Sequence, residues 1–224
     1  MKITYLCHAS FLLEHNGTTV LLDPFFTDEK KVLEKYPQVK HPDYILASHG
    51  HDDHIGSAFS VAGEKTTVVG IVELCGLFSK RGYATIGMNF GGTVKLTPDL
   101  SVTLVKADHS SSFNGIYTGE PAGFVLSFGG KTIYFSGDTS VFCDMKLINE
   151  FYHPTIGLLC VGGHFTADMK AMAYAIDNFF DFDLVIPMHY NTFPPITVPI
   201  DEFPSIVKGR TKVKILAPLE QTTI

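Results

Sequence analysis

Several features are missing from this chain of 224 residues, and each absence argues against a class of protein. The 17 lysines and arginines are scattered and the formal net charge is −6, whereas nucleic-acid-binding proteins usually carry a clustered basic patch. No apolar run approaches the length of a membrane span. A strand-like pattern begins at residue 2, which leaves no room for a signal peptide. The sequence therefore predicts a cytoplasmic protein that binds neither nucleic acid nor a membrane.

Cysteine motifs, serine-hydrolase motifs and linkers are also lacking. No Cys-x-x-Cys pair occurs, so we expect the four cysteines to be small buried side chains in a reducing compartment: Cys7, Cys75, Cys143 and Cys160. A Gly-x-Ser-x-Gly motif is absent, which leaves a serine hydrolase without support. No linker, low-complexity segment or internal repeat interrupts the chain, and its length suits one domain. We expect residues 1–224 to form a single domain.

The most informative segment that is present runs from Ser48 to Ile55 and reads Ser-His-Gly-His-Asp-Asp-His-Ile. Three histidines and two carboxylates fall within its six central positions, and these groups are common protein ligands of zinc and similar divalent ions. Clustering them without a counter-ion is costly. The apolar run 44–47 precedes the segment as a strand that would deliver it into a cleft. The segment predicts the core of a two-metal hydrolytic site.

Further ligand candidates follow other predicted strands. They are His109 after residues 101–106, Asp138 after 131–135 and His189 after 183–186. Open sheets place their ligand sites at the carboxyl ends of strands, so these groups could meet the histidine-rich segment in one crevice. A single histidine after a strand is weak support by itself, because such a residue is more often structural. The recurrence together with the cluster favours a metal site.

Side-chain alternation suggests how two ions would share the ligands. In an extended segment, His49, His51 and Asp53 point to one side, and a turn into a helix lets Asp53 and His54 share one direction. One ion would then be held by three histidines, and the other by a carboxylate and two histidines. The two predicted sets are His49, His51 and His109, and Asp53, His54 and His189, with Asp138 bridging both.

The order of the predicted elements indicates the fold class. An opening meander is followed by units in which helices alternate with strands, so we expect an α/β protein with two sheets packed face to face and helices outside. The meander covers three short runs around an Asn16-Gly17 hairpin signal. Helices are predicted over residues 30–35, 54–62, 71–81, 141–150 and 168–180. The segment 109–120, rich in serine and glycine, is predicted to be a functional loop.

The His-x-His-x-Asp-His cluster, the later single histidine, the Gly-Asp-Thr carboxylate and the final histidine make the chain resemble the metallo-β-lactamase-fold hydrolases. Within that superfamily it is similar to the metal-dependent hydrolases related to ascorbate-6-phosphate lactonase. Four segments carry this closer resemblance: residues 7–11 (Cys-His-Ala-Ser-Phe), 22–25 (Leu-Asp-Pro-Phe), 162–166 (Gly-Gly-His-Phe-Thr) and 188–194 (Met-His-Tyr-Asn-Thr-Phe-Pro). The resemblance covers nearly the whole chain. It implies a four-layer αββα sandwich of two mixed sheets, with a dinuclear metal site at one edge.

The resemblance also implies a mechanism. A hydroxide held between two divalent ions would attack a small ester, lactone or phosphoester. Zinc is the first expectation for the metal, and manganese, nickel and iron suit the same mixed ligands. Asp53 would orient the attack and carry the proton, while His164 would contact the substrate or the developing oxyanion. His8 is a histidine at the site rim in the family; for both His8 and His164 a structural role is the alternative. Asp23 is expected to hydrogen-bond a ligand histidine.

Three alternatives to a small-molecule hydrolase remain open at this point. A nuclease of the same fold is disfavoured by the acidic balance. An iron redox protein of the fold would favour a carboxylate in place of His51. A non-catalytic metal-dependent binding or regulatory protein is disfavoured because no ligand position has been lost. The predicted partner is a small molecule, and an anionic one is compatible because bound metals supply positive charge. The sequence leaves both a monomer and a homo-oligomer open.

Overall fold

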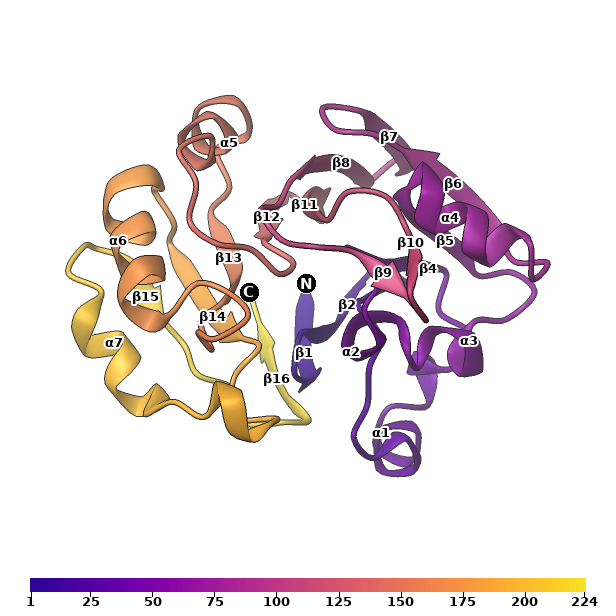
Figure 1. Cartoon of the computed structure of the whole chain (residues 1–224), viewed down its shortest axis with the longest axis horizontal. Coiled ribbons are helices and arrows are strands. Elements are labelled where there is room, and N and C mark those ends of the chain that lie inside the picture. The colour runs from indigo at the N-terminus through magenta and orange to yellow at the C-terminus, as the bar shows by residue number, and fades with distance from the viewer. The chain divides into compact units, whose positions relative to one another are not determined.

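The computed structural model describes residues 1–224, and the chain divides into two compact units (Figure 1). Unit 1 comprises residues 1–89, 110–121 and 217–224, and unit 2 comprises residues 90–109 and 122–216. Each unit contains one seven-stranded sheet with parallel and antiparallel pairs. The predicted α/β class with two mixed sheets is therefore confirmed. The single-domain prediction for residues 1–224 stays a prediction, and the two units are described separately.

The sheet of unit 1 has the order β16-β1-β2-β3-β4-β5-β6. Its strands are β1 (Lys2–Cys7), β2 (Ser10–His15), β3 (Thr18–Leu22), β4 (Tyr44–Leu46), β5 (Thr67–Ile71), β6 (Ala84–Met88) and β16 (Glu220–Thr223). The predicted opening meander is confirmed, because β1, β2 and β3 pair antiparallel in sequence. Asn16 and Gly17 both have positive φ, 47° and 81°, as a tight two-residue hairpin turn requires. Strands β6 and β16 were not predicted.

The helices of unit 1 are α1 (Glu29–Lys35), α2 (Asp52–Ile55), α3 (Ala58–Val61) and α4 (Val72–Ser79). A single-turn 3₁₀ helix, Pro37–Val39, follows α1. The predicted continuous helix over 54–62 is wrong, since two short helices replace it. The Ser57 amide donates to the Pro24 carbonyl at 2.9 Å instead of to Asp53, the acceptor that a continuous helix would use. The Ser57 hydroxyl accepts from the Phe26 amide at 3.0 Å. The break therefore ties this segment to the loop after β3.

The sheet of unit 2 has the order β15-β14-β13-β12-β11-β8-β7. Its strands are β7 (Thr93–Thr97), β8 (Leu100–Lys106), β11 (Ala122–Phe128), β12 (Lys131–Phe135), β13 (Ile156–Cys160), β14 (Leu184–Met188) and β15 (Lys212–Val213). Strands β12 to β15 pair parallel, and β7, β8, β11 and β12 pair antiparallel. Strands β11 and β12 form an antiparallel hairpin.

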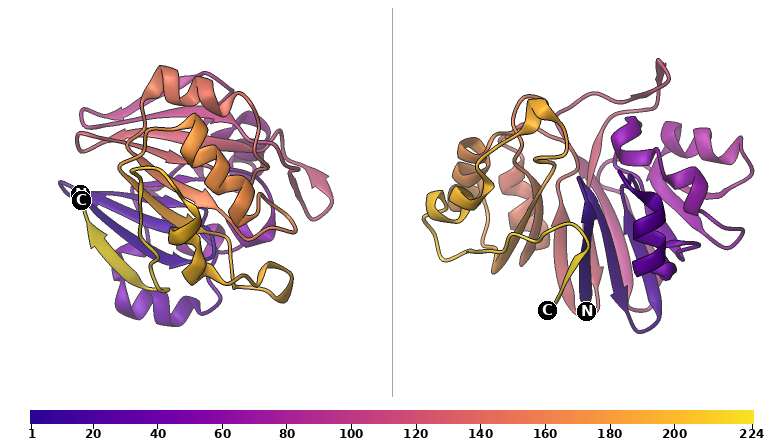
Figure 2. Two further views of the ribbon diagram at one scale, coloured as in Figure 1. Left: turned by 90° about the vertical axis from the view of Figure 1, so that its left-hand side faces the viewer. Right: turned by 90° about the horizontal axis from the view of Figure 1, so that it is seen from below.

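The helices of unit 2 are α5 (Met145–Tyr152), α6 (Met169–Phe179) and α7 (Phe203–Ile206), with 3₁₀ turns at Pro194–Ile196 and Ile200–Glu202. Within each unit the helices lie on one side of the sheet (Figure 2). The predicted loop 109–120 contains a small hairpin, β9 (Ser112–Phe113) with β10 (Ile116–Tyr117), which belongs to unit 1. No helix combines the length and apolar character needed to cross a membrane.

The prediction that the four cysteines are buried is confirmed for three of them and wrong for the fourth. Cys7, Cys75 and Cys160 are buried, whereas Cys143 is exposed and the prediction for it is wrong. Cys143 lies in the turn before α5 and not on a strand or on the buried face of a helix, which explains its exposure. Strand β13 is buried along its whole length, as is usual for a strand with a parallel neighbour on each side.

Candidate metal centre

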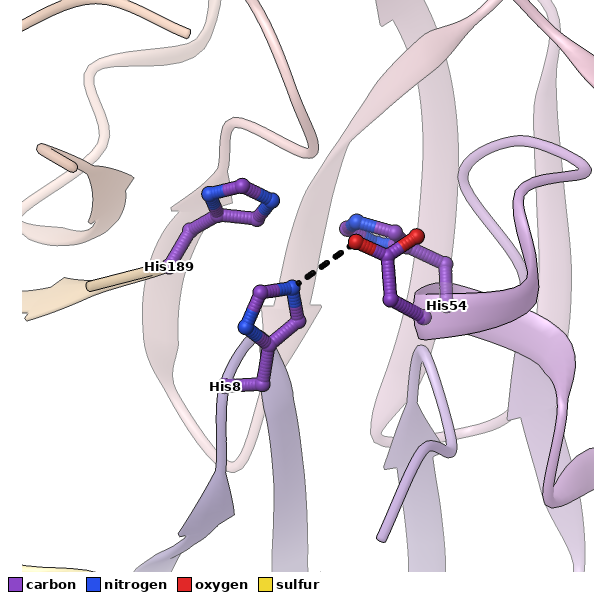
Figure 3. Close-up of side chains that lie close together, drawn as sticks. His8, His54 and His189 are labelled. Carbon is purple, nitrogen blue, oxygen red and sulfur yellow. Dashed lines mark hydrogen bonds and ion pairs between the residues drawn. The ribbon is translucent and has the colours of Figure 1, made fainter. Parts of the chain in front are cut away.

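Five of the predicted site residues gather in unit 1, after the carboxyl end of β4 and in the turn after β1. They are His8, His49, His51, Asp53 and His54. The His49 Nε2 and His51 Nδ1 atoms lie 3.0 Å apart, and the His8 Nε2 atom lies 3.2 Å from Asp53 Oδ2. The rings of His49 and His54 have centroids 4.1 Å apart. Figure 3 shows His8 and His54, with the contact from His8 to the Asp53 carboxylate dashed.

A buried carboxylate, Asp23, organises two of these histidines. Its Oδ1 accepts the Ser48 amide at 2.7 Å, and its Oδ2 accepts the Ser48 hydroxyl at 2.5 Å and His54 Nδ1 at 2.6 Å. The Ser48 oxygen lies 2.9 Å from His49 Nδ1. Since the Ser48 proton points to Asp23, the Ser48 oxygen accepts from His49. Both His49 and His54 therefore carry their proton on Nδ1, which leaves Nε2 as the lone-pair nitrogen that binds a metal. The predicted hydrogen bond between Asp23 and a candidate ligand histidine is confirmed.

The charge of Asp23 depends on these neighbours. Complete burial raises the pKa of Asp23, while the adjacent His54 and the hydrogen bonds from Ser48 oppose that rise. The residue also has a left-handed backbone, with φ 39°. The sequence signal for this arrangement is the Asp23-Pro24 pair directly after an apolar strand. No sequence signal marks Ser48, and its hydrogen bonds to Asp23 and His49 were not predicted.

The other predicted ligands meet in unit 2. Asp138 Oδ2 lies 2.9 Å from His189 Nε2 and 3.6 Å from His109 Nε2. Asp138 and His189 are almost completely buried, and the His109 side chain is 13% exposed. The three residues follow β12, β14 and β8, so the predicted placement at strand ends is confirmed within this unit. A carboxylate oxygen between two imidazoles is suited to a shared or bridging ligand role.

Hydrogen bonds join the segments that carry these predicted ligands. The Asp108 amide donates to Thr139 Oγ1 at 2.9 Å, and the Ser140 hydroxyl donates to the Asp108 carboxylate at 2.8 Å. The Ser140 amide also donates to the Asp108 carbonyl at 3.0 Å. The residues beside His109 and Asp138 are thus held together by three hydrogen bonds. This network fixes the two ligand segments in relation to each other.

His164 occupies a different setting from the other predicted residues. It lies in the loop after β13, is exposed, and makes a T-shaped contact with the Phe165 ring at 4.4 Å between centroids. Its loop is fixed by the Ala167 amide, which donates to the Thr139 carbonyl at 2.8 Å. The loop therefore abuts the segment that contains Asp138. The predicted substrate contact of His164 stays a prediction.

Four of the site residues have left-handed backbones: His8 (φ 56°), Asp23 (φ 39°), His164 (φ 56°) and His189 (φ 58°). Residues other than glycine occupy this region infrequently, and such conformations gather at functional sites. His164 lies four positions after the end of β13, whereas the other three residues, His8, Asp23 and His189, directly follow a strand. The sharp backbone turn at a strand end is what points these side chains away from the strand.

The donor atoms in both units fit a divalent ion. Two ligands of one tetrahedral ion with bonds of about 2.1 Å lie about 3.4 Å apart. The observed separations of 3.0 Å in unit 1, and of 2.9 and 3.6 Å in unit 2, bracket that value. Imidazole and carboxylate donors are the chemistry that zinc, manganese, nickel and iron share.

Comparison with known proteins identifies the family. The family described as "Beta-lactamase superfamily domain" matches residues 2–189, which is most of the chain. The chain belongs to the metallo-β-lactamase superfamily. A "UPF0173 metal-dependent hydrolase" of Paracoccus denitrificans is 42% identical over 202 residues, covering 87% of each chain. Another of that name, from Carboxydothermus hydrogenoformans, is 41% identical over 238 residues and covers all of both chains.

A solved structure agrees with this assignment. The chain is similar to Igni18, described as a metallo hydrolase from the archaeon Ignicoccus hospitalis, with a TM-score of 0.89 and 35% identity. The match covers 99% of this chain and 97% of that one. This member of the metallo-β-lactamase superfamily is therefore a metal-dependent hydrolase, as the sequence predicted. The non-catalytic alternative is set aside.

Proposed function

We propose that residues 1–224 act as one hydrolase domain that uses two divalent ions, with zinc as the first choice, to cleave a small ester, lactone or phosphoester. The ions would be held by the seven predicted ligands: His49, His51, Asp53, His54, His109, Asp138 and His189. Family membership supports this proposal, since it makes a metal-dependent hydrolase of the whole chain.

The observation that carries the proposal is the position of Asp138 between two histidines. One carboxylate oxygen lies near both His109 and His189, as expected of a carboxylate that would bridge two ions. Unit 1 offers a matching set, in which Asp23 holds two imidazoles with their Nε2 atoms as donors. When bound, the ions would lower the pKa of a water and polarise the scissile group of the substrate.

Two residues of unit 1 are proposed to handle the proton. Asp53 is half-buried, with its side chain 30% exposed, so it is accessible to an attacking water. Its Oδ2 lies 3.2 Å from His8 Nε2, which lets His8 orient the carboxylate and share the proton that Asp53 takes up. Tyr5 supports this arrangement, because its hydroxyl donates to the His8 carbonyl at 3.0 Å. His164 is proposed to contact the substrate or its developing oxyanion from its exposed loop.

The partner is proposed to be a small molecule and not a nucleic acid, given the net charge of −6. A nuclease of the same fold is the second candidate, and phosphodiester cleavage would distinguish it. A cytoplasmic location is supported by four cysteines without disulfides, as is usual in reducing compartments. Self-association into a homo-oligomer is compatible with the proposal and does not affect the chemistry.

The test is purification without chelator, quantification of bound metal, and a panel of lactone, ester, thioester and phosphodiester substrates. We expect about two divalent ions per chain, and turnover of at least one carbonyl or phosphoester substrate that a chelator abolishes. Replacement of Asp138 by asparagine should reduce both metal content and turnover. One ion per chain with full activity would reject the dinuclear arrangement. Fast phosphodiester cleavage with little turnover of the other substrates would favour the nuclease.

A further inference from the structure

The small hairpin of β9 and β10 lies in the segment that connects β8 to β11, and its strands pair with neither main sheet. Asn114 and Gly115 at its tip have φ of 50° and 75°, which suits a tight two-residue turn. Figure 2 shows this hairpin, in pink, extending away from the sheet of unit 1. A two-stranded hairpin of this size is not stable alone in water. Contacts at its base must therefore hold it in place.

The first anchor joins the hairpin to the metal-ligand segment. Ser111 and Thr118, which flank the hairpin, are buried, and their hydroxyl oxygens lie 2.7 Å apart. The Gly50 amide donates to Ser111 Oγ at 3.1 Å. Gly50 lies between the ligands His49 and His51, and a side chain there would clash with Thr118 Oγ1. The base of the hairpin is thus fixed directly against the backbone that carries two proposed ligands.

The second anchor is aromatic. The Phe113 ring packs against Phe59 of α3 with centroids 5.8 Å apart. The Arg81 guanidinium lies 4.9 Å from the Phe59 centroid and 5.9 Å from that of Phe113, and its Nη1 donates to the Leu77 carbonyl at 2.9 Å. Cation–π contacts of this kind stabilise the packed rings. Arg81 is engaged in this stack.

The strand register determines which side chains share the anchored face. Phe113 pairs with Ile116, and Ser112 pairs with Tyr117. Directly paired residues lie on the same face, so Ile116 is on the face of Phe113, which packs against α3, and Tyr117 is on the opposite face. Ile116 is nevertheless 64% exposed, because it lies next to the turn. A large apolar side chain is therefore presented at the free end of an element whose base touches the ligand segment.

Carboxylates lie on the Tyr117 side of the hairpin, whereas the Arg81 cation lies on the Phe113 side. The Tyr117 hydroxyl donates to Glu120 at 2.8 Å, and this hydrogen bond, together with the charges of Glu120 and Glu73, raises the pKa of Tyr117. The Glu73 carboxylate also lies beside Gly119. Carboxylates in this position disfavour an anionic substituent on a bound molecule. On the other face Arg81 is already stacked on the aromatic rings, and the exposed apolar side chain of Ile116 suits contact with a neutral, apolar group.

Resting on the proposed function, we propose that Ile116 determines specificity, and that the hairpin 111–118 is a substrate-binding flap anchored at Gly50. The substrate class is a carbonyl ester, lactone or thioester with an apolar acyl substituent, in preference to an anionic phosphoester. Ile116 contacts the acyl substituent. Ser111 and Thr118 position the flap over the ligand segment without touching the substrate.

The test compares the zinc-loaded wild type with variants on p-nitrophenyl acetate, butyrate and octanoate, and on bis(p-nitrophenyl) phosphate. We expect kcat/KM to rise with acyl length in the wild type. In Ile116→Ala the octanoate-to-acetate ratio of kcat/KM should fall about tenfold, chiefly through KM. The variant loses the apolar contact that the Ile116 side chain makes with the acyl chain, and the loss of a few carbon atoms from such a contact changes selectivity by about this factor. Ile116→Leu should restore the ratio. Tyr117→Ala, truncated on the opposite face, is the matched control and should keep the wild-type ratio.

Bound zinc and the melting temperature are measured for every variant, so that loss of the fold is recognised. A wild-type ratio in Ile116→Ala, with normal metal content, would overturn the assignment of Ile116 and leave the proposed function intact. A wild-type preference for the phosphodiester over octanoate would overturn the substrate class. Hydrolysis of none of the four compounds by wild type that binds two zinc ions would count against the proposed function itself.

Discussion

At the scale of single residues, one buried carboxylate organises the metal-ligand segment. Asp23 accepts three hydrogen bonds, from the Ser48 amide, the Ser48 hydroxyl and His54. Through Ser48 it also sets the proton position on His49. A metal-binding imidazole needs its other nitrogen protonated and held, and here one side chain does this for two proposed ligands. Asp23 is therefore a positioning residue, and its removal should lower the affinity for the metal.

Replacement of Asp23 by asparagine tests this role. The amide cannot accept all three hydrogen bonds, from the Ser48 amide, the Ser48 hydroxyl and His54, because one of its two terminal atoms is a donor. We expect zinc affinity to fall about 10- to 100-fold, the usual effect of losing such a partner. Competition with a chelating dye measures the affinity. Asp52→Asn, which changes an exposed carboxylate in the neighbouring segment, should retain wild-type affinity. Equal affinities for the two variants would contradict the role of Asp23.

At the scale of elements, the helix after the His164 loop begins where a side chain caps it. Asp168 accepts from the Ala171 amide at 2.8 Å at the start of α6. Helix α5 offers a contrast, since Asp144 at the same position makes no side-chain capping bond. Helix α6 also buries Met172 and Ile176, one turn apart, against the rest of unit 2. Its sequence-predicted start at residue 168 therefore coincides with its cap.

The two capping positions provide a matched pair of variants. Asp168→Ala removes a capping hydrogen bond and should lower the free energy of unfolding by about 1 kcal/mol. Asp144→Ala has no such bond to lose and should change it by less than about half that amount. Urea unfolding followed by circular dichroism gives both values. A larger loss for Asp144→Ala than for Asp168→Ala would show that the cap does not stabilise α6.

At the scale of the whole molecule, each unit buries a thiol in its interior. Burial raises the pKa of Cys75 in unit 1 to about 12 and that of Cys160 in unit 2 to about 11, and the Asp138 charge adds to the rise at Cys160. In the unfolded chain these thiols ionise near their ordinary pKa of about 8.5 to 9. Above that pH the unfolded chain has released protons that the folded chain still holds. Stability must therefore fall as pH rises above about 9.

Unfolding at several pH values tests this linkage at Cys75. Below the unfolded-state pKa, Cys75 is protonated in both states and leaves the free energy of unfolding unchanged. By pH 10, ionisation of Cys75 in the unfolded chain should lower the free energy of unfolding by about 1.4 kcal/mol. Cys75→Ala should remove that part of the decline, whatever its effect on stability at pH 7. Cys143→Ala replaces an exposed thiol and should leave the pH profile unchanged. Identical alkaline profiles for wild type and Cys75→Ala would refute the prediction.

The sequence predicted most strands because their signals are local. Apolar alternation and turn residues such as Asn16-Gly17 act over a few neighbours, and they placed the opening meander of β1 to β3, and also β4, β8, β12 and β14, near their observed bounds. Strand β16 was missed because its residues, Glu220–Thr223, are mostly polar and exposed, and it is a strand through its pairing with β1. The helix over 54–62 was wrong because its break depends on Pro24, more than thirty positions away.

The sequence by itself determined the family, the fold class and the identity of the candidate ligands, since spacing and residue chemistry are written in the chain. Only the tertiary structure decided how those ligands are held. The bond from His54 to Asp23 spans 31 positions, and that from Gly50 to Ser111 spans 61. Such contacts exist only when strand pairing has brought distant segments together. The tautomers of two histidines and the anchoring of the β9–β10 hairpin were therefore beyond any local pattern.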